Sequence, residues 1–261
     1  MDHPALGFYR SPPYTILTDE SFFRVENTVR ALQKLFAQFM TVFGPLIRNT
    51  DREDGIQVLF FSKEPEYVAY QRRYAPRMDD SSGFYSPALD RLIVYNQSAS
   101  DRVRKLETQV KEEYNKHLAE AISKNAMDQL EKWKRESMQN IANYAEAQTL
   151  CTIRHEGAHQ LFFTLGVHSR NRMENEWMME GLAAYCENSN LGGVDRSRVK
   201  LLKKAMDAGA LIPLEELVNL RSPDGLMGLG STERVALAYS ESWALTQWLM
   251  NEHRALFFDY I

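Results

Sequence analysis

The chain has 261 residues, a formal net charge of −4 and a hydrophobic fraction of 44%. That length and composition allow a substantial core, in one large domain or in two lobes. A charged fraction of 25% argues against wholesale disorder, and the slight acidity excludes the basic face on which nucleic-acid binding usually depends. We therefore expect a folded protein that does not bind nucleic acid.

The sequence has no apolar run near the roughly 20 residues that cross a bilayer, so no transmembrane segment is expected. The first residues also lack the apolar stretch of a signal peptide. We expect a cytoplasmic protein if Met1 is the native start, and an exported one if a signal peptide has been removed. The apolar end at Ile261 leaves open whether the chain continues.

Two cysteines, Cys151 and Cys186, are too few for a disulfide-rich scaffold or for a zinc site made of four cysteines. Two reduced, buried thiols are the favoured interpretation, because free cysteine is often buried. A single disulfide between them is the alternative.

The first hundred residues read as a small α/β lobe, residues 1–98, built on an antiparallel or mixed sheet. Apolar residues recur every three or four positions from Phe22 to Phe43 and predict one amphipathic helix, which Gly44-Pro45 closes. Runs of β-forming residues predict strands, and a hairpin is expected with its turn at residues 87–90. The remaining predicted elements are strands at 14–20 and 56–62, a short helix at 64–74 and the hairpin over 83–97.

Residues 99–146 are expected to form a charged helical hairpin. No glycine or proline occurs between Ala88 and Glu156, and apolar residues keep a helical period on both sides of a break at 123–128. The charged faces are interpreted as solvated surface. This hairpin could cover one side of the molecule and act as a latency element over a cleft.

The segment that carries chemistry is TIRHEGAHQLFFTLG, residues 152–166. His155 and His159 lie four residues apart, so on a helix their imidazoles share a face about 6 Å apart and can bind one metal ion. Glu156 is rotated by about 100° and can activate a metal-bound water without becoming a ligand. The alternative is two exposed histidines on an ordinary helix.

A third ligand would separate these interpretations, and Glu180 is the candidate. It lies in a second predicted helix, ENEWMMEGLAAYCEN at 174–188, whose apolar neighbours make a solvated charge less favourable. Small residues on both helices would let the two backbones approach closely. They are Gly157, Ala158, Gly181 and Ala183.

The HExxH motif followed by W-x-x-E-G-L-A-x-Y resembles the gluzincin metallopeptidases. A further segment, YSESWALTQWL at 239–249, is similar to one in uncharacterised bacterial proteins classed as peptidases of that superfamily. The resemblance implies zinc bound by His155, His159 and Glu180, with Glu156 as the base. It also implies an edge strand that binds an extended peptide, for which RLIVYN at 91–96 is the candidate.

Two positions depart from the thermolysin-like pattern or are uncertain within it. Ala184 stands where those members carry an aspartate that orients a histidine, and Glu176 or Glu187 could take that part, although both are more typical of surface charges. Tyr239 resembles the tyrosine that stabilises the developing oxyanion in some gluzincins. Packing against Trp243 is an equal alternative for Tyr239, and His168 and His253 are interpreted as bystanders.

The sequence therefore predicts an α+β chain with a two-lobe zincin-like fold. A small sheet-bearing N-terminal lobe would face a mainly helical, zinc-binding lobe, residues 147–261. The expected function is a zinc-dependent metallopeptidase acting on a peptide or protein substrate. The alternatives are a non-catalytic binding or structural protein on the same fold, and a metal-dependent hydrolase of small amides.

Overall fold

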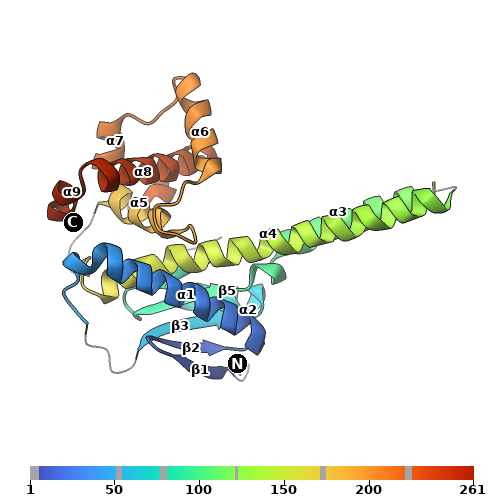
Figure 1. Cartoon of the computed structure of the whole chain (residues 1–261), viewed down its shortest axis with the longest axis horizontal. Helices are drawn as coiled ribbons and strands as arrows, with labels where there is room; N and C mark the ends of the chain where they lie inside the picture. The colour runs from blue at the N-terminus through green and yellow to red at the C-terminus, as the bar shows by residue number, and fades with distance from the viewer. Residues whose placement is uncertain (1–5, 51–54, 77–80, 121–122, 171–174, 221–224) are drawn as a thin grey trace.

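The computed structural model describes residues 6–50, 55–76, 81–120, 123–170, 175–220 and 225–261. The chain is an α+β protein, as expected, with its sheet in the N-terminal part and helices through most of the remainder (Figure 1). A long helix, α4 (Lys124–Thr164), runs between the sheet and the C-terminal helices.

The sheet has five strands in the order β1-β2-β3-β5-β4 and is mixed. The parallel pairs β2–β3 and β3–β5 form its centre, and antiparallel pairs close both sides. The predicted strands and the predicted hairpin are confirmed, whereas β1 was not anticipated. The strands are β1 (Gly7–Ser11), β2 (Tyr14–Thr18), β3 (Ile56–Phe61), β4 (Gly83–Ser86) and β5 (Arg91–Tyr95).

The strand order corrects the expected edge. Residues 91–96 were predicted to form it, but β5 lies between β3 and β4. In the hairpin, β5 pairs with β3, so β4 lies at the edge of the sheet. The edge nearest the HExxH segment is therefore β4, which packs against α4.

Both faces of the sheet are covered, which explains the nearly continuous apolar runs in its strands. Val58 and Phe60 of β3 face the core formed with α1 (Phe22–Phe43) and α4. The alternate residues Leu59 and Phe61 face the opposite side, where they pack with Tyr67 of α2 (Glu64–Tyr74).

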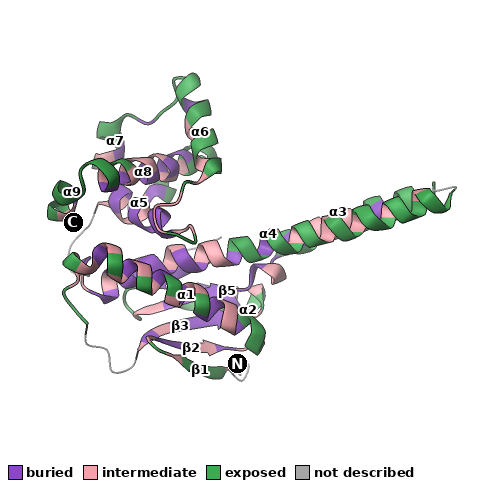
Figure 2. Ribbon diagram, in the orientation of Figure 1, coloured by how far each residue is buried: buried purple, intermediate pink, exposed green. Residues whose placement is uncertain are grey.

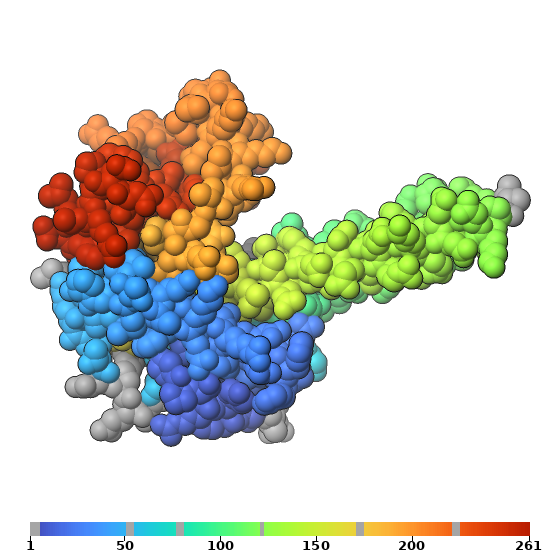
Figure 3. Space-filling view, in the orientation of Figure 1, coloured from blue at the N-terminus to red at the C-terminus, as the bar shows by residue number. Residues whose placement is uncertain are grey.

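A helical arm, residues 101–144, projects from the body of the molecule (Figures 1 and 3). It consists of α3 (Asp101–Leu118) and the first half of α4, and the side chains of Ser100 and Ser123 cap the two helices. Most of its residues are exposed or half-buried (Figure 2). The predicted hairpin is thus present, but it points away from the body, which gives no support to the hypothesis that it covers a cleft as a latency element.

The C-terminal part is a group of helices packed around α8 (Thr232–Glu252). Its neighbour α5 carries Glu180, and α6 also packs against α8. The remaining elements are α5 (Glu176–Cys186), α6 (Arg196–Asp207), α7 (Leu214–Asn219) and α9 (Arg254–Tyr260), with 3₁₀ turns at Gly44–Leu46, Gln97–Ala99 and Gly225–Leu229.

The two glycines among the predicted small residues do not lie between α4 and α5. Gly157 on α4 faces Leu32 and Leu35 of α1, and a Cβ there would lie 3.2 Å from each. Gly181 on α5 faces α8. Each glycine therefore permits the approach of a third helix, and the contact between α4 and α5 does not depend on this pair.

Two further expectations concern cysteines and membranes. Cys151 and Cys186 are both free, and Cys186 is buried. Within the described ranges, no helix is both long enough and apolar enough to span a bilayer.

Candidate metal centre

The HExxH segment lies in the last quarter of α4, where the helix is packed between α1, the sheet and α5. The rings of His155 and His159 are 4.9 Å apart between centroids. Both side chains are largely buried but keep 14% and 13% of their surface exposed. The helix ends just beyond them, and Gly166 adopts a φ of 72°, the left-handed conformation that glycine tolerates at helix ends.

Glu180 on α5 reaches this pair of histidines from the other side. Its Oε2 atom lies 3.1 Å from Nε2 of His155 and 3.6 Å from Nε2 of His159. The three residues place one candidate ligand atom each within 4.8 Å of one another. Ligand atoms around a tetrahedral zinc ion are about 3.4 Å apart, so this donor set fits zinc.

Opposite charges in this cluster shift the pKa values of Glu180 and His155. Burial alone would raise the pKa of Glu180, but the charge of His159 and a hydrogen bond from His155 hold it well below its usual value. Burial would lower the pKa of His155, but hydrogen bonds to Glu180 and Glu187 raise it well above its usual value. The cluster therefore keeps an ionised carboxylate between the two histidines, ready to balance a cation.

Glu156 lies between this cluster and the edge strand. Its Oε2 atom accepts a hydrogen bond of 3.0 Å from the main-chain N–H of Tyr85 in β4. Burial raises the pKa of Glu156 despite the nearby histidine charges. A carboxylate with a raised pKa is a stronger base, which is what proton transfer near neutral pH requires.

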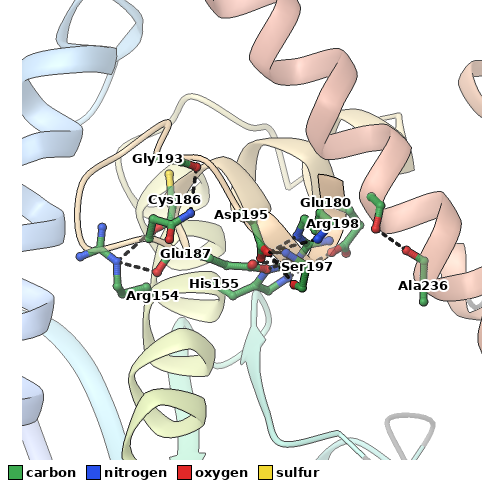
Figure 4. A network of polar contacts seen from close by, with 12 residues as sticks. Arg154, His155, Glu180, Cys186, Glu187, Gly193, Asp195, Ser197, Arg198 and Ala236 are labelled. Atoms are coloured by element: carbon green, nitrogen blue, oxygen red, sulfur yellow. Dashed lines mark hydrogen bonds and ion pairs between the residues drawn. The ribbon is translucent and has the colours of Figure 1, made fainter. Parts of the chain in front are cut away.

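Glu187, at the C-terminal end of α5, orients His155 (Figure 4). Its Oε1 atom lies 2.9 Å from Nδ1 of His155. When Nδ1 carries the proton, Nε2 is left free to bind a metal, and histidine ligands commonly donate their other N–H to a carboxylate in this way. The side chain of Glu187 is only 11% exposed, so the surface interpretation of Glu187 was wrong.

Arg154 fixes the end of α5 on which Glu187 sits. Its Nε atom donates to the carbonyl oxygens of Cys186 at 2.9 Å and Glu187 at 3.0 Å. A cation at a helix C-terminus satisfies its last carbonyls and opposes the negative end of the helix dipole. Only the position of Arg154 next to His155 could have suggested this role from the sequence.

Tyr239 on α8 completes the group. Its ring centroid is 6.3 Å from that of His155. Burial raises its pKa, and the negative charges of Glu180 and Glu156 raise it further. Its hydroxyl therefore stays protonated, and it forms a hydrogen bond with Glu180.

The other two histidines considered in the sequence lie apart from the three ligand candidates. His168 is buried with its ring 4.9 Å from that of Phe162, and neither of its nitrogens has a hydrogen-bond partner among the described residues. His253 packs against Trp248 at 4.6 Å between ring centroids.

One family model matches part of the chain. It is described as Protein of unknown function (DUF1570) and covers residues 149–261. That range includes all the site residues on α4, α5 and α8 and excludes the sheet and the arm. A comparison with curated proteins gave no match.

Proposed function

We propose that this protein is a zinc-dependent peptidase of the gluzincin type. The observation that carries the proposal is the convergence of His155, His159 and Glu180 within 4.8 Å. Glu156 next to the first histidine adds a base that a purely structural metal site does not need. This favours catalysis over a non-catalytic binding role.

In this proposal His155, His159 and Glu180 would hold the ion. Zinc, when bound, supplies a Lewis acid that acidifies a water molecule and polarises the scissile carbonyl. Glu156 takes a proton from the attacking water and passes it to the leaving amine. The hydroxyl of Tyr239 donates a hydrogen bond to the negative charge that develops on the carbonyl oxygen.

The position of β4 at the edge of the sheet favours a peptide as the substrate. Among the described strands β4 pairs only with β5, and the main-chain N–H of Tyr85 in β4 points to Glu156. An extended peptide that adds to this edge would pass beside the base. Peptides of graded length would separate this activity from hydrolysis of small amides, because only longer chains gain contacts along β4.

The first test measures zinc per chain on protein purified without a histidine tag. We expect about one zinc ion per chain in the wild type and a much lower content in Glu180→Ala, because three protein ligands are typical of catalytic zinc sites. Absence of zinc from the reconstituted wild type would refute the proposal.

The second test separates catalysis from metal binding. Glu156→Gln should retain zinc and lose hydrolysis, whereas Glu146→Gln, an exposed residue of the same helix, should change neither. Retained hydrolysis in Glu156→Gln would refute the assigned base. Zinc binding without hydrolysis of any peptide would favour the non-catalytic alternative.

A further inference from the structure

We propose that Arg198 is a positioning residue for the zinc ligand His155, and that it acts through Glu187. The inference rests on the zinc site proposed above. It assigns to α6, an element outside the three-ligand cluster, a part in holding the metal.

Glu187 receives hydrogen bonds from two sides (Figure 4). The Nη2 atom of Arg198 lies 2.8 Å from both Oε1 and Oε2 of Glu187. Oε1 also accepts from Nδ1 of His155 at 2.9 Å. The carboxylate therefore links the guanidinium of Arg198 to the imidazole of His155.

This link needs a positive charge at position 198. The side chains of Glu187 and Arg198 expose only 11% and 16% of their surface. A buried carboxylate must be paired, and a neutral imidazole that binds a metal through Nε2 no longer supplies a full charge. Arg198 is then the cation that keeps Glu187 ionised and fixed toward Nδ1.

The position of Arg198 is itself set by the start of α6. Asp195 caps this helix, and its Oδ1 atom accepts from the main-chain N–H groups of Ser197 at 2.8 Å and Arg198 at 3.1 Å. The Oδ2 atom of Asp195 lies 3.6 Å from Nε of Arg198. The cap thus fixes both the main chain and the charge environment of Arg198.

Two arginines hold different parts of Glu187. Arg154 on α4 holds the main chain of Glu187, and Arg198 on α6 holds its side chain. Loss of such outer partners weakens metal affinity by roughly 10–100-fold. We expect that range for Arg198→Gln and for Glu187→Gln.

The experiment measures the zinc dissociation constant of the full chain by competition with a chelator. The variants are Glu187→Gln, Arg198→Gln, the double variant and Arg198→Lys. Arg196→Gln is the control, because Arg196 is exposed on the same turn and carries the same charge. The melting temperature of each metal-free variant shows whether it folds.

If Arg198 acts through Glu187, the double variant binds zinc no more weakly than Glu187→Gln alone, because one path is removed twice. Arg198→Lys should retain most of the affinity, since one nitrogen of Arg198 makes both contacts. Arg196→Gln should match the wild type.

Two results would overturn the inference while the zinc site stands. One is wild-type affinity in a folded Arg198→Gln variant, and the other is a double variant in which the two losses multiply. Absence of zinc from the wild type would overturn both this inference and the proposed function. If the Arg198→Gln variant does not fold, Arg198→Lys is compared with Glu187→Gln instead. Equal losses of zinc affinity in these two variants would also contradict the inference.

Discussion

Gly181 of α5 lies against Thr246 of α8 with no room for a side chain. A Cβ built on Gly181 would be 2.3 Å from Oγ1 of Thr246 and 2.6 Å from the carbonyl oxygen of Ser242. The second contact is with main chain, which cannot move away as a flexible side chain can. The close approach of these two helices therefore sets the position of the neighbouring residue Glu180.

Gly181→Ala should destabilise the protein by about 1–3 kcal/mol, because overpacking forces the helices apart. It should also weaken zinc binding, since Glu180 moves with α5. Gly44→Ala is the matched control, because a Cβ there would meet nothing within 4 Å. Denaturant unfolding and zinc competition measure the two effects, and equal values for the two variants would contradict the prediction.

Replacement of Arg154 tests the clamp at the end of α5. Arg154→Met keeps most of the buried volume but leaves the carbonyls of Cys186 and Glu187 without their donor. We expect a loss of roughly 1.5–3 kcal/mol in the free energy of unfolding, the usual range for hydrogen bonds to charged groups. Arg135→Met, exposed on the same helix, should be close to wild type.

Tyr239→Phe removes the hydroxyl and keeps the ring. If the hydroxyl stabilises the oxyanion, kcat should fall about 10²–10³-fold while KM and zinc content change little. Steady-state kinetics on a cleaved peptide measure this. Unchanged kcat would favour the alternative in which Tyr239 only packs with its neighbours.

The burial of His168 predicts that acid destabilises the fold. Burial lowers its pKa from 6.5 to about 3, so the fold favours the neutral imidazole. Below pH 6.5 His168 binds a proton in the unfolded chain but stays neutral in the folded chain. The free energy of unfolding therefore falls as the pH falls toward 3. Above that window the contribution is fully present.

Each pH unit inside this window should cost at most about 1.4 kcal/mol from this group. His168→Leu, which packs a similar volume against Phe162, should lose that part of the pH dependence. Unfolding free energies of both proteins between about pH 4 and pH 7 measure the difference. Parallel curves would show that His168 is protonated in the folded state.

Removal of the outer arm tests whether it belongs to the stable core. Replacing residues 108–137 by a short glycine-rich turn should leave the fold and the zinc content intact, because Tyr114 is the one buried residue described in that span. Circular dichroism and metal analysis would check this. A chain that no longer folds would show that the arm stabilises the body.

The sequence predicted elements wherever one periodicity dominated. The stripe from Phe22 to Phe43 and the runs that became β2 and β3 are one-dimensional signals, and they were read correctly. The edge strand was predicted wrongly, because the apolar run of β5 carries no information on which of its two sides pairs with β3. Strand order depends on contacts far apart in the chain.

The candidate site shows the same division. His155, His159 and Glu180 were predicted from spacing and apolar surroundings, and the structure brings them together. Glu187 was a candidate for orienting a histidine, but the sequence favoured a surface charge at this position. Its burial arises from Arg198, which a loop and a new helix bring back from eleven positions later.

The continuity of α4 has a geometric consequence for the arm. One rigid rod of 41 residues carries both the projecting half and the two histidines. A single inserted residue between them would turn the arm by about 100° around the helix axis. Insertions of seven would lengthen the arm by about 10 Å and nearly preserve the side of α4 on which α3 lies. The side of α4 on which α3 lies is therefore fixed, to within one residue of chain length, relative to the two histidines.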